Sequence, residues 1–556
     1  MSYLGGNVPP TSEAWEQEEG RYISESLSGL TKRHRMIILL TVGLVTAIEI
    51  SNRISINVLL PDMQGNVAAS SDDISWVITL YNLGFLCSLG LATWMTRVIG
   101  ARRHLLLSIA FYSTGAMGCF LSKHSLEFLL VSRLIMGFGG GAFLVRAVIL
   151  AGLMFPGKAR IAAVTWLYAV LGFFEVTYPL AMGWIDDTFH WNYAFLLDFP
   201  FLIIAVFLIL KYVPQGYLWK RRTEGKADIR GAIFLLASLA CLQTALSRGE
   251  QDLWFESFWI GPTLLAAVVF FIAFLWRDSR SDYSAPVFHL RMVWRQKYLR
   301  TSFSVILIIG AIFGAGLFVV PQYLRTVQDY SATQTGGFIS MYTIGLSLGL
   351  LLTLRALIPR IGGPHTIMLG LTLLIGTCIA LVYIWTPTTP TEILAPAIFL
   401  QGLALGPILL GASNIATANA PLPDLNDIST TYFFVRQLGN TFGVTAATVM
   451  FDHRMTFHSS RQLDQANRLA PIVRSTLTQY ANVIHRNGGG SSNPSLGALQ
   501  LFQANVITQS RLLSYIDIYL GLGALACVAL FLLGFGRIKS KLGPSHFHPW
   551  SVNCFF

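Results

Sequence analysis

The segment "MIILLTVGLVTAIEISNRISINVLL", residues 36–60, is long enough to cross a bilayer and polar at its centre. A helix of about 20 residues spans a hydrocarbon core of about 30 Å. Glu49, Asn52 and Arg53 stand near the middle of the segment, where a charge costs about 2.5–3.5 kcal/mol on insertion scales. The segment therefore predicts a membrane-spanning helix in which the polar residues need a partner or a cavity.

Apolar segments of similar length recur along the whole chain. Of the 556 residues, 53% are hydrophobic and 12% are charged, whereas an ordinary soluble domain has about 25% charged residues. The segments lack the alternation of membrane-barrel strands, so they predict helices. We expect an all-α polytopic membrane protein with fourteen transmembrane helices. The expected helices span residues 36–60, 75–96, 104–122, 127–154, 160–183, 191–213, 229–247, 257–276, 301–323, 335–357, 364–386, 393–416, 427–450 and 513–535.

The distribution of positive charge predicts the orientation of the chain. Cytoplasmic loops of membrane proteins are enriched in Lys and Arg, and the loops on the side of the N-terminus carry most of them here. The short loops on the opposite side hold only Lys123, Arg248 and Arg325. Both termini are therefore predicted to be cytoplasmic, in an inner-membrane protein without a cleaved signal peptide. The net charge of +11 is then a topology signal, and nucleic acid is not expected as a partner.

The connection between the last two predicted helices is unusually long. Residues 451–512 form an extracytoplasmic stretch, and long loops translocate largely regardless of their charge. Its middle, "NGGGSSNPS" at 487–495, predicts a flexible insert between helix-forming flanks. Two interpretations remain open, which are a solvated helical hairpin of no special role and a docking site for a partner.

Polar residues at membrane depth are the candidate functional residues, because a buried charge needs a partner or a water-filled cavity. Glu49 and Arg53 are four residues apart, so they can meet on one face of a helix. The pair is either purely structural or part of a cavity in which Glu49 binds a proton or a substrate cation. The deeply placed residues are Glu49, Asn52, Arg53, Arg146, Glu175 and Asp198.

Two further arginines, Arg133 and Arg436, lie closer to the predicted helix ends. Long side chains near a helix end can snorkel to the interface, which is the simplest expectation for both. The Gly-rich stretch "RLIMGFGGGAF" at 133–143 predicts close helix packing. A phosphate-binding loop would need a preceding strand and a following Lys, and the sequence has neither.

The sequence shows no catalytic pattern. Its histidines fall at loops and helix ends, and it contains no HExxH, G-x-S-x-G or P-loop motif. The six cysteines are scattered without metal-ligand spacing. We therefore expect no enzyme, cofactor or metal site. A transporter needs only a polar site near mid-membrane whose exposure can alternate.

Six stretches of the sequence resemble motifs of one transporter family. They are "SWVITLYNLGFL" (75–86), "GLATWMTRVIGARR" (90–103), "SRLIMGFGGG" (132–141), "HWNYAFLLDFP" (190–200), "ADIRGAIFLLASLACLQTALSRGEQDLWF" (227–255) and "FVRQLGNTFG" (434–443). Together they are similar to the fourteen-helix drug:proton antiporter branch of the major facilitator superfamily, the EmrB/QacA type of multidrug exporter. The similarity extends over residues 36–535.

The resemblance implies the major facilitator fold, in which two six-helix bundles alternate the access to a central site and a two-helix insert joins them. The divisions it implies are 1–35 as a cytoplasmic tail, 36–213 as the N-terminal bundle, 214–300 as the two-helix insert with cytoplasmic linkers, 301–535 as the C-terminal bundle including the extracytoplasmic loop 451–512, and 536–556 as a second cytoplasmic tail.

The motifs are kept in part. Arg133 and Gly137 match the family's R-x-x-Q-G element, with Met136 in place of Gln. Asp198 stands where the family usually has Asn at the opening of helix 6, and Arg436 lies in the specific motif of helix 13.

Three departures from the family pattern concern helix 1, the following loop and helix 5. The membrane-buried Asp of helix 1 is replaced by Asn52, and Glu49 one turn earlier is a candidate for a displaced carboxylate. Thr96 replaces the usual Asp of the loop after helix 2, which puts the salt bridges of that motif in doubt. In helix 5 two residues of the family motif are kept, and two glycines of the motif are replaced by larger residues. The residues concerned are Pro179 and Gly183, which are kept, and Tyr178 and Met182, which replace glycines.

The resemblance implies drug or multidrug efflux, that is, export of amphiphilic small molecules by proton-coupled antiport. Glu49 is then the leading proton acceptor and Glu175 the second candidate. A dedicated exporter of one metabolite, such as a siderophore or an anionic amphiphile contacted by Arg53 and Arg146, is the alternative, and a polytopic enzyme or sensor is a remote one. The length of 451–512 also suggests a periplasmic adaptor and an outer-membrane channel as partners.

Overall fold

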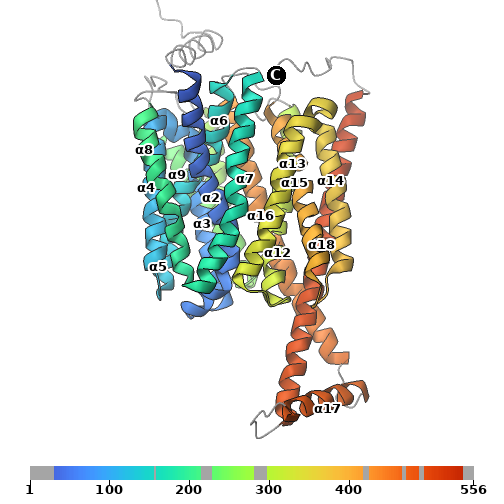
Figure 1. Cartoon of the computed structure of the whole chain (residues 1–556). Coiled ribbons are helices and arrows are strands. Elements are labelled where there is room, and N and C mark those ends of the chain that lie inside the picture. The colour runs from blue at the N-terminus through green and yellow to red at the C-terminus, as the bar shows by residue number, and fades with distance from the viewer. Residues whose placement is uncertain are drawn as a thin grey trace, which may run out of the picture.

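The computed structural model describes residues 30–155, 158–213, 228–280, 297–417, 425–465, 471–486 and 494–541. Every regular element in these ranges is a helix, and the helices stand side by side in a bundle (Figure 1). The predicted all-α fold is confirmed. The first described helix begins and the last one ends at the same end of the bundle in Figure 1.

The first half of the chain forms six crossings, two of which are interrupted. The predicted helix 127–154 is broken after Gly140, and the predicted helix 191–213 opens with a 3-10 turn that ends at Asp198. Each segment still crosses as one span, Leu126–Ala151 and Trp191–Tyr212, so both predicted crossings are confirmed and the interruptions are local. The elements are α2 (Lys32–Asn66), α3 (Ser71–Ile99), α4 (Ala101–Leu121), α5 (Leu126–Gly140), α6 (Phe143–Met154), α7 (Lys158–Thr188), η1 (Trp191–Asp198) and α8 (Phe199–Tyr212).

The second half begins with a helix pair and continues with six longer crossings. A π turn joins α13 to α14, and Gly362, at a positive φ of 75°, kinks α14 near its start. The elements are α9 (Ile229–Arg248), η2 (Trp254–Glu256), α10 (Ile260–Arg280), α12 (Lys297–Thr326), α13 (Ala332–Leu352), η3 (Thr353–Leu357), α14 (Ile358–Ile384), α15 (Thr391–Thr417), α16 (Leu425–Gln465), α17 (Pro471–Arg486) and α18 (Pro494–Lys541).

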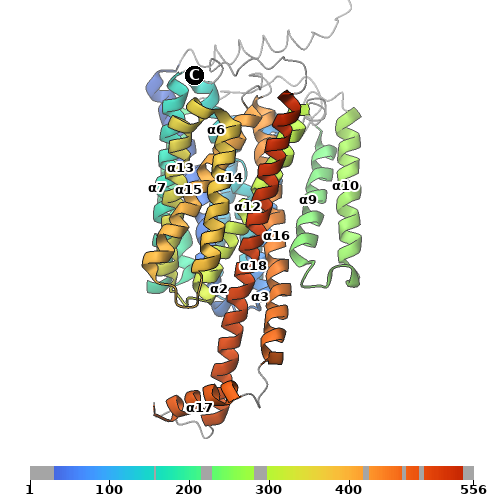
Figure 2. The same ribbon diagram turned by 90° about the vertical axis from the view of Figure 1, so that its right-hand side faces the viewer.

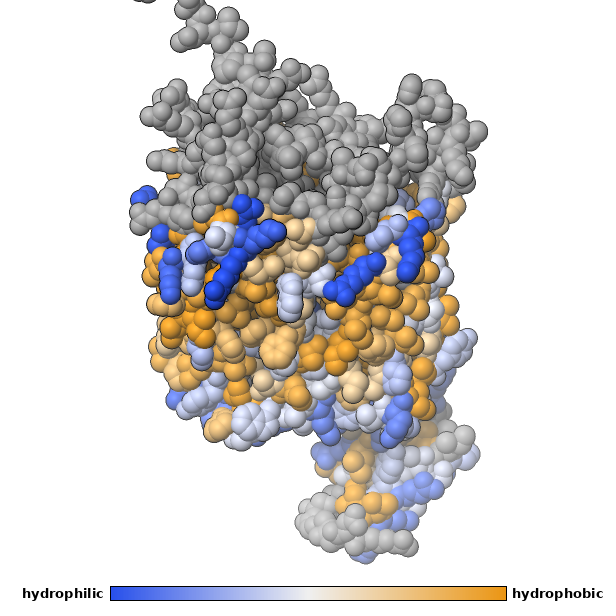
Figure 3. Space-filling model, turned by 45° about the horizontal axis from the view of Figure 1, so that its top comes forward, coloured by the Kyte–Doolittle hydropathy of each residue, from blue (hydrophilic) through white to orange (hydrophobic). Residues whose placement is uncertain are grey.

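The number of crossings agrees with the predicted fourteen. The described residues contain twelve helical segments that are long and apolar enough to span a membrane. One of these, Ala332–Ile384, contains both α13 and α14, and α16 runs through the bundle although its polar end keeps it out of that group. Figure 3 shows a broad apolar band across the middle of the viewed face, with hydrophilic residues at its edges. The chain is a multi-pass membrane protein.

The long connection at 451–512 is helical and continuous with its neighbours. The predicted helix ends at 450 and 513 are wrong, because α16 continues to Gln465 and α18 already begins at Pro494. Polar but helix-forming residues such as those of "RQLDQ" let the helix continue beyond its apolar part. With α17 packed on α18, this hairpin extends well beyond the bundle (Figures 1 and 2). Of the predicted flexible insert, residues 487–493 lie outside the described ranges.

The crossings form two sets of helices, α2 to α8 and α12 to α18. Each set packs tightly within itself and contacts the other through a few pairs of helices. In the first set α3 packs on α5 and α2 on α7, and in the second α12 packs on α16 and α13 on α15. The sets meet where α7 crosses α13 and where α3 crosses α16. The pair α9 and α10 lies at one side of the bundle in Figure 2, with α9 against α3.

Glycines permit the closest of these crossings, as the motif residues predicted. A Cβ on Gly137 of α5 would lie 2.1 Å from the carbonyl oxygen of Tyr81 in α3. A Cβ on Gly183 of α7 would lie 2.4 Å from the carbonyl oxygen of Ala332 in α13. On the facing helix, Gly336 approaches the carbonyl of Pro179 with the same closeness, at 2.3 Å. Small residues at these positions let the backbones touch.

Candidate functional site

A cavity lies between the two sets of helices. It is walled by α2, α3 and α5 on one side and by α12 and α16 on the other, and the space between these walls is about 620 Å³, open solvent included. Its wall combines apolar side chains with a few polar ones. The polar and charged residues of the wall are Arg53, Asn57, Tyr81, Asn82, Arg133 and Asn440.

Glu49 and Arg53 meet as the helical spacing predicted. The Nε of Arg53 lies 3.0 Å from Oε1 of Glu49, and the same oxygen accepts a hydrogen bond of 2.9 Å from the hydroxyl of Tyr81. Glu49 is fully buried, and its Oε2 has no hydrogen-bond partner among the described residues. One oxygen of the Glu49 carboxylate is therefore paired. The other can bind a proton or accept a hydrogen bond.

Arg53 connects this pair to the other set of helices. Its side chain is 16% exposed, lines the cavity and stacks on the ring of Phe85 at 4.7 Å. Its Nη1 donates a hydrogen bond of 3.4 Å to Oε1 of Gln437 in α16. A change in the charge of Glu49 therefore acts on a side chain that bridges the two sets.

Asn52 and Asp198 form a hydrogen bond that sequence analysis did not anticipate. Nδ2 of Asn52 donates to Oδ2 of Asp198 over 3.0 Å, and both residues are fully buried. In the family pattern the acid is expected at 52 and the amide at 198, so the two departures are reciprocal. Compared with the family pattern, the acid and the amide have exchanged places: the carboxylate stands at the start of α8, and the amide that donates to it stands in α2.

Two tyrosines complete the surroundings of Asp198. The hydroxyl of Tyr178 donates to Oδ1 over 3.0 Å, and that of Tyr112 donates to Oδ2 over 3.3 Å. Tyr178 is one of the residues that fill a glycine place in helix 5. The departures at 52, 178 and 198 therefore converge on one buried carboxylate, which neutral donors hold. Asp198, predicted as a motif residue and as one of the residues at membrane depth, is thus a second buried acid beside Glu49.

Arg133 is inside the bundle, so the expectation that it snorkels was wrong. Its side chain is fully buried, and its guanidinium lies 4.3 Å from the centre of the Tyr81 ring. Its Nε donates to the carbonyl of Val77 over 3.3 Å, and its Nη1 contacts the sulfur of Met136 at 3.6 Å. Met136, which replaces the family's Gln, therefore still offers Arg133 a weak acceptor. Stacking on an aromatic face is the physical reason that this charge stays inside.

Arg436 and Glu175 lie on facing sides of the interface between the two sets. Arg436 is eleven residues into α16, half-buried, and packs over Phe433 at 5.2 Å, so snorkelling does not describe it either. Glu175 of α7 is 7% exposed, and within the described ranges its carboxylate forms no ion pair. The charges of Arg53 and Arg436 act on it. Glu175 is therefore a buried acid without a fixed partner.

Arg146 does not join this cavity. It lies in α6, where its Nη2 donates to the carbonyl of Ala92 over 2.9 Å and contacts Thr96 and His104. The expectation that Arg146 and Arg53 contact one substrate is not supported, because the two residues line different pockets. Thr96, the replacement for the usual loop Asp, is a neutral partner of Arg146.

Polar contacts close the interface between the two sets at both ends of the bundle. Arg325 of α12 forms an ion pair with Asp62 of α2, and Asp187 of α7 accepts hydrogen bonds from Thr333, at 2.5 Å for the hydroxyl and 2.8 Å for the backbone amide. These contacts lie at the end from which the hairpin extends (Figure 1). Thr93 of α3 bonds Thr430 of α16 at 2.6 Å. Sequence analysis missed them because they join residues more than 100 positions apart.

The ion pair between Asp62 and Arg325 is expected to hold the two sets of helices together at this end of the bundle. Arg325→Gln is expected to raise the population opened at that end about fivefold, because a partly exposed pair contributes about 1 kcal/mol. The measurement is the distance between spin labels at Asn66→Cys and Asp329→Cys, both exposed, with the native cysteines replaced. Arg248→Gln is the control, since its ion pair with Asp252 joins the end of α9 to the turn that follows it and does not link the two sets. An unchanged distance distribution in Arg325→Gln would show that this ion pair does not keep that end of the bundle closed.

Comparison with known proteins assigns this fold to a family. Two sets of helices with a cavity of mixed polar and apolar wall between them form the arrangement that a membrane carrier needs. The model of the family described as Major Facilitator Superfamily matches residues 42–444. The chain belongs to the Major Facilitator Superfamily.

Relatives and solved structures agree with this assignment. The multidrug export protein EmrB of Haemophilus influenzae is 24% identical over 450 residues, which are 79% of this chain and 85% of that protein. Multidrug resistance protein 3 of Bacillus subtilis is 24% identical over 400 residues, 70% of this chain and 75% of that protein. The crystal structure of the POT family transporter PepTSo matches with a TM-score of 0.59 at 15% identity and covers 93% of this chain and 100% of that chain. The likeness to the crystal structure shows the fold alone.

Proposed function

We propose that this protein exports amphiphilic small molecules by alternating access and that inward proton flow drives the export. Membership of the Major Facilitator Superfamily and the similarity to proteins named for multidrug export and resistance support this function. The observation that carries the proposal is the buried pair of Glu49 and Arg53 at the cavity between the two sets of helices. Aromatic and aliphatic side chains of the same wall suit an amphiphilic substrate.

Protonation of Glu49 provides the coupling. When Glu49 is ionised, it holds Arg53, and Arg53 reaches Gln437 in the other set. A proton on Glu49 removes that attraction and frees the bridge between the sets. A substrate cation and a proton then compete for the same carboxylate, which is the condition for exchange of one for the other. Glu175 and Asp198 are further buried acids from which a proton can be passed or held.

The proposed setting is the bacterial inner membrane with both termini in the cytoplasm. The positive loops predict this orientation, and it places the helical hairpin of α16, α17 and α18 outside. The hairpin carries exposed apolar residues, among them Leu463, Val483 and Leu496. We propose it as the surface that meets a periplasmic adaptor, which would pass substrates to an outer-membrane channel.

The deciding experiment measures transport in proteoliposomes with an imposed pH gradient. Glu49→Gln is expected to reduce gradient-driven accumulation of a cationic dye at least about tenfold, because a neutral amide cannot exchange protons. Dye movement down its own gradient is expected to persist. Glu175→Gln tests the second candidate acid. Glu127→Gln, an exposed acid in the first turn of α5, is the control and is expected to behave like the parent. Normal gradient-driven accumulation in both buried variants would refute the assignment of the coupling site.

A dedicated exporter of one anionic amphiphile is the second candidate function. It is favoured by the two guanidinium groups at the cavity wall, Arg53 and Arg133, of which Arg133 keeps its Nη2 without a hydrogen-bond partner in the described structure. Screening cationic dyes against anionic metabolites in the same vesicles separates the two functions.

A further inference from the structure

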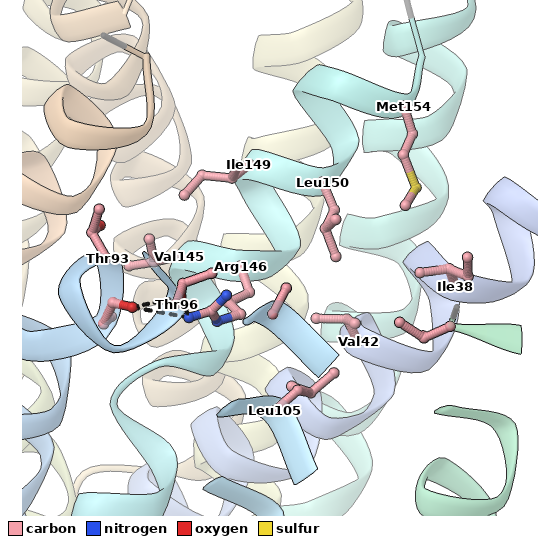
Figure 4. Close-up of a pocket in the computed structure, with 13 residues that line it drawn as sticks. Ile38, Val42, Thr93, Thr96, Leu105, Val145, Arg146, Ile149, Leu150 and Met154 are labelled. Atoms are coloured by element: carbon pink, nitrogen blue, oxygen red, sulfur yellow. Dashed lines mark hydrogen bonds between the residues drawn. The ribbon is translucent and has the colours of Figure 1, made fainter. Parts of the chain in front are cut away.

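A second pocket lies wholly within the first set of helices. Its walls come from α2, α3, α4 and α6, with Val213 at the end of α8, and the space between them is about 600 Å³, open solvent included. Figure 4 shows Arg146 reaching from α6 toward Thr96 across this pocket, with aliphatic side chains around it. No residue of the second set belongs to the wall as described, so the pocket is separate from the central cavity. The labelled apolar residues are Ile38, Val42, Leu105, Val145, Ile149, Leu150 and Met154.

The pocket contains one buried cation whose charge is not balanced. Arg146 is 8% exposed, and its contacts are the carbonyl of Ala92, the hydroxyl of Thr96 and the ring of His104. In the described part of the chain no carboxylate lies within ion-pair distance of it, and its buried Nε has no hydrogen-bond partner. Arg53, which is partly exposed, has Glu49 as its counter-charge, and the fully buried Arg133 stacks on the ring of Tyr81, whereas Arg146 has neither kind of partner in the described ranges. A buried guanidinium with neither an anion nor an aromatic face against it is costly unless a bound molecule compensates it.

The end of the pocket at Met154 carries a further positive charge. Nη1 of Arg35 donates to the carbonyl of Met154 over 3.2 Å, close to Ile38. This end lies with the basic residues that open α2, at the side where the first described helix begins (Figure 1). The pocket therefore has a cation near its end at Met154 and a second one inside, with apolar walls between them.

We propose that this pocket binds an acyl-chain amphiphile with an anionic head group, whose anion is paired with Arg146 and whose chain lies against the aliphatic walls. The ligand belongs to one set of helices, so it can stay bound while the two sets move. Thr93 lines the pocket and also bonds Thr430 of the second set at 2.6 Å. Occupancy therefore acts on a contact that holds the two sets together, at a site distinct from that of the transported substrate.

The test is direct binding to the purified full chain in an uncharged detergent. Native mass spectrometry and thermal unfolding are measured with oleate, with oleyl alcohol as the uncharged matched probe, and with phosphatidylglycerol. We expect one bound oleate and at least about tenfold weaker binding of oleyl alcohol, because the charged head contributes through Arg146. Competition of phosphatidylglycerol with oleate identifies a bilayer lipid as the source, and its failure to compete identifies a free amphiphile; either result supports the site.

Variants locate the bound molecule. Arg146→Gln is expected to weaken oleate binding at least about tenfold, whereas Arg146→Lys retains much of it, because the charge is kept. Ile38→Trp fills the pocket and leaves Arg146 in place, so it is expected to abolish binding of both probes even if Arg146→Gln does not fold. Equal binding of oleate and oleyl alcohol, or unchanged oleate binding in Arg146→Gln and Ile38→Trp, overturns the proposal.

Discussion

Exchanging the residues at positions 52 and 198 is expected to restore the stability that each single substitution removes. Asp198→Asn replaces one of the two carboxylate oxygens by an NH2 group, so one acceptor shared by Asn52 and the tyrosine hydroxyls is lost, and an unsatisfied buried group costs about 1–3 kcal/mol. Asn52→Asp places two carboxylates across a contact of 3.0 Å in a buried site, which is destabilising for both as anions. In the double variant Asn52→Asp, Asp198→Asn the acid returns to α2, and the contact between residues 52 and 198 again has a donor and an acceptor.

The measurement is a double-mutant cycle on thermal unfolding of the purified protein, combined with transport in vesicles. Each single variant is expected to unfold at lower temperature, and the coupling between the two sites is expected to exceed about 1 kcal/mol because they are in direct contact. Asn57→Asp combined with Asp198→Asn is the control, since Asn57, as far as the described residues go, bonds the carbonyl of Ile54 in its own helix and not Asp198. Additive losses in the exchanged pair would show that the carboxylate is not transferable between the two helices.

Gly137→Ala is expected to disrupt both the bundle and the site. Its Cβ would lie 2.1 Å from the carbonyl oxygen of Tyr81 and 3.1 Å from the backbone nitrogen of Phe85, so α3 and α5 would have to separate. Overpacking of this kind costs about 1–3 kcal/mol or more. Because Tyr81 also bonds Glu49 and stacks on Arg133, the separation moves the residues of the cavity as well.

Fluorescence-detected size exclusion and thermal unfolding measure this loss. Gly376→Ala in α14 is the matched control, because a Cβ there has no atom within 4 Å and Ala favours helix more than Gly. We expect Gly376→Ala to be as stable as the parent, or more stable. A Gly137→Ala protein with parental unfolding temperature would contradict the packing described for α3 and α5.

The sequence was sufficient for the features that depend on local composition. Apolar length identified the helices, since each crossing must satisfy its own backbone in lipid. The spacing of four residues placed Glu49 against Arg53, and the glycines of 133–143 indicated close packing. Sequence could not find the interruption after Gly140 or the continuation of α16 to Gln465, because helices there depend on neighbours and on polar residues that fit either a helix or a loop.

The central sites were decided by the tertiary structure. Asn52 and Asp198 are 146 positions apart, so their replacements looked like two unrelated losses until the fold brought them within one hydrogen bond. Charge at membrane depth predicted that Arg53 and Arg146 need partners, and only the packing showed that Arg53 has Glu49 while Arg146 has an apolar pocket with no anion among the described residues. The sequence by itself determined which side chains are costly to bury, because that cost is a property of the residue. Which groups compensate the cost is a property of the fold, because the partners come from distant helices.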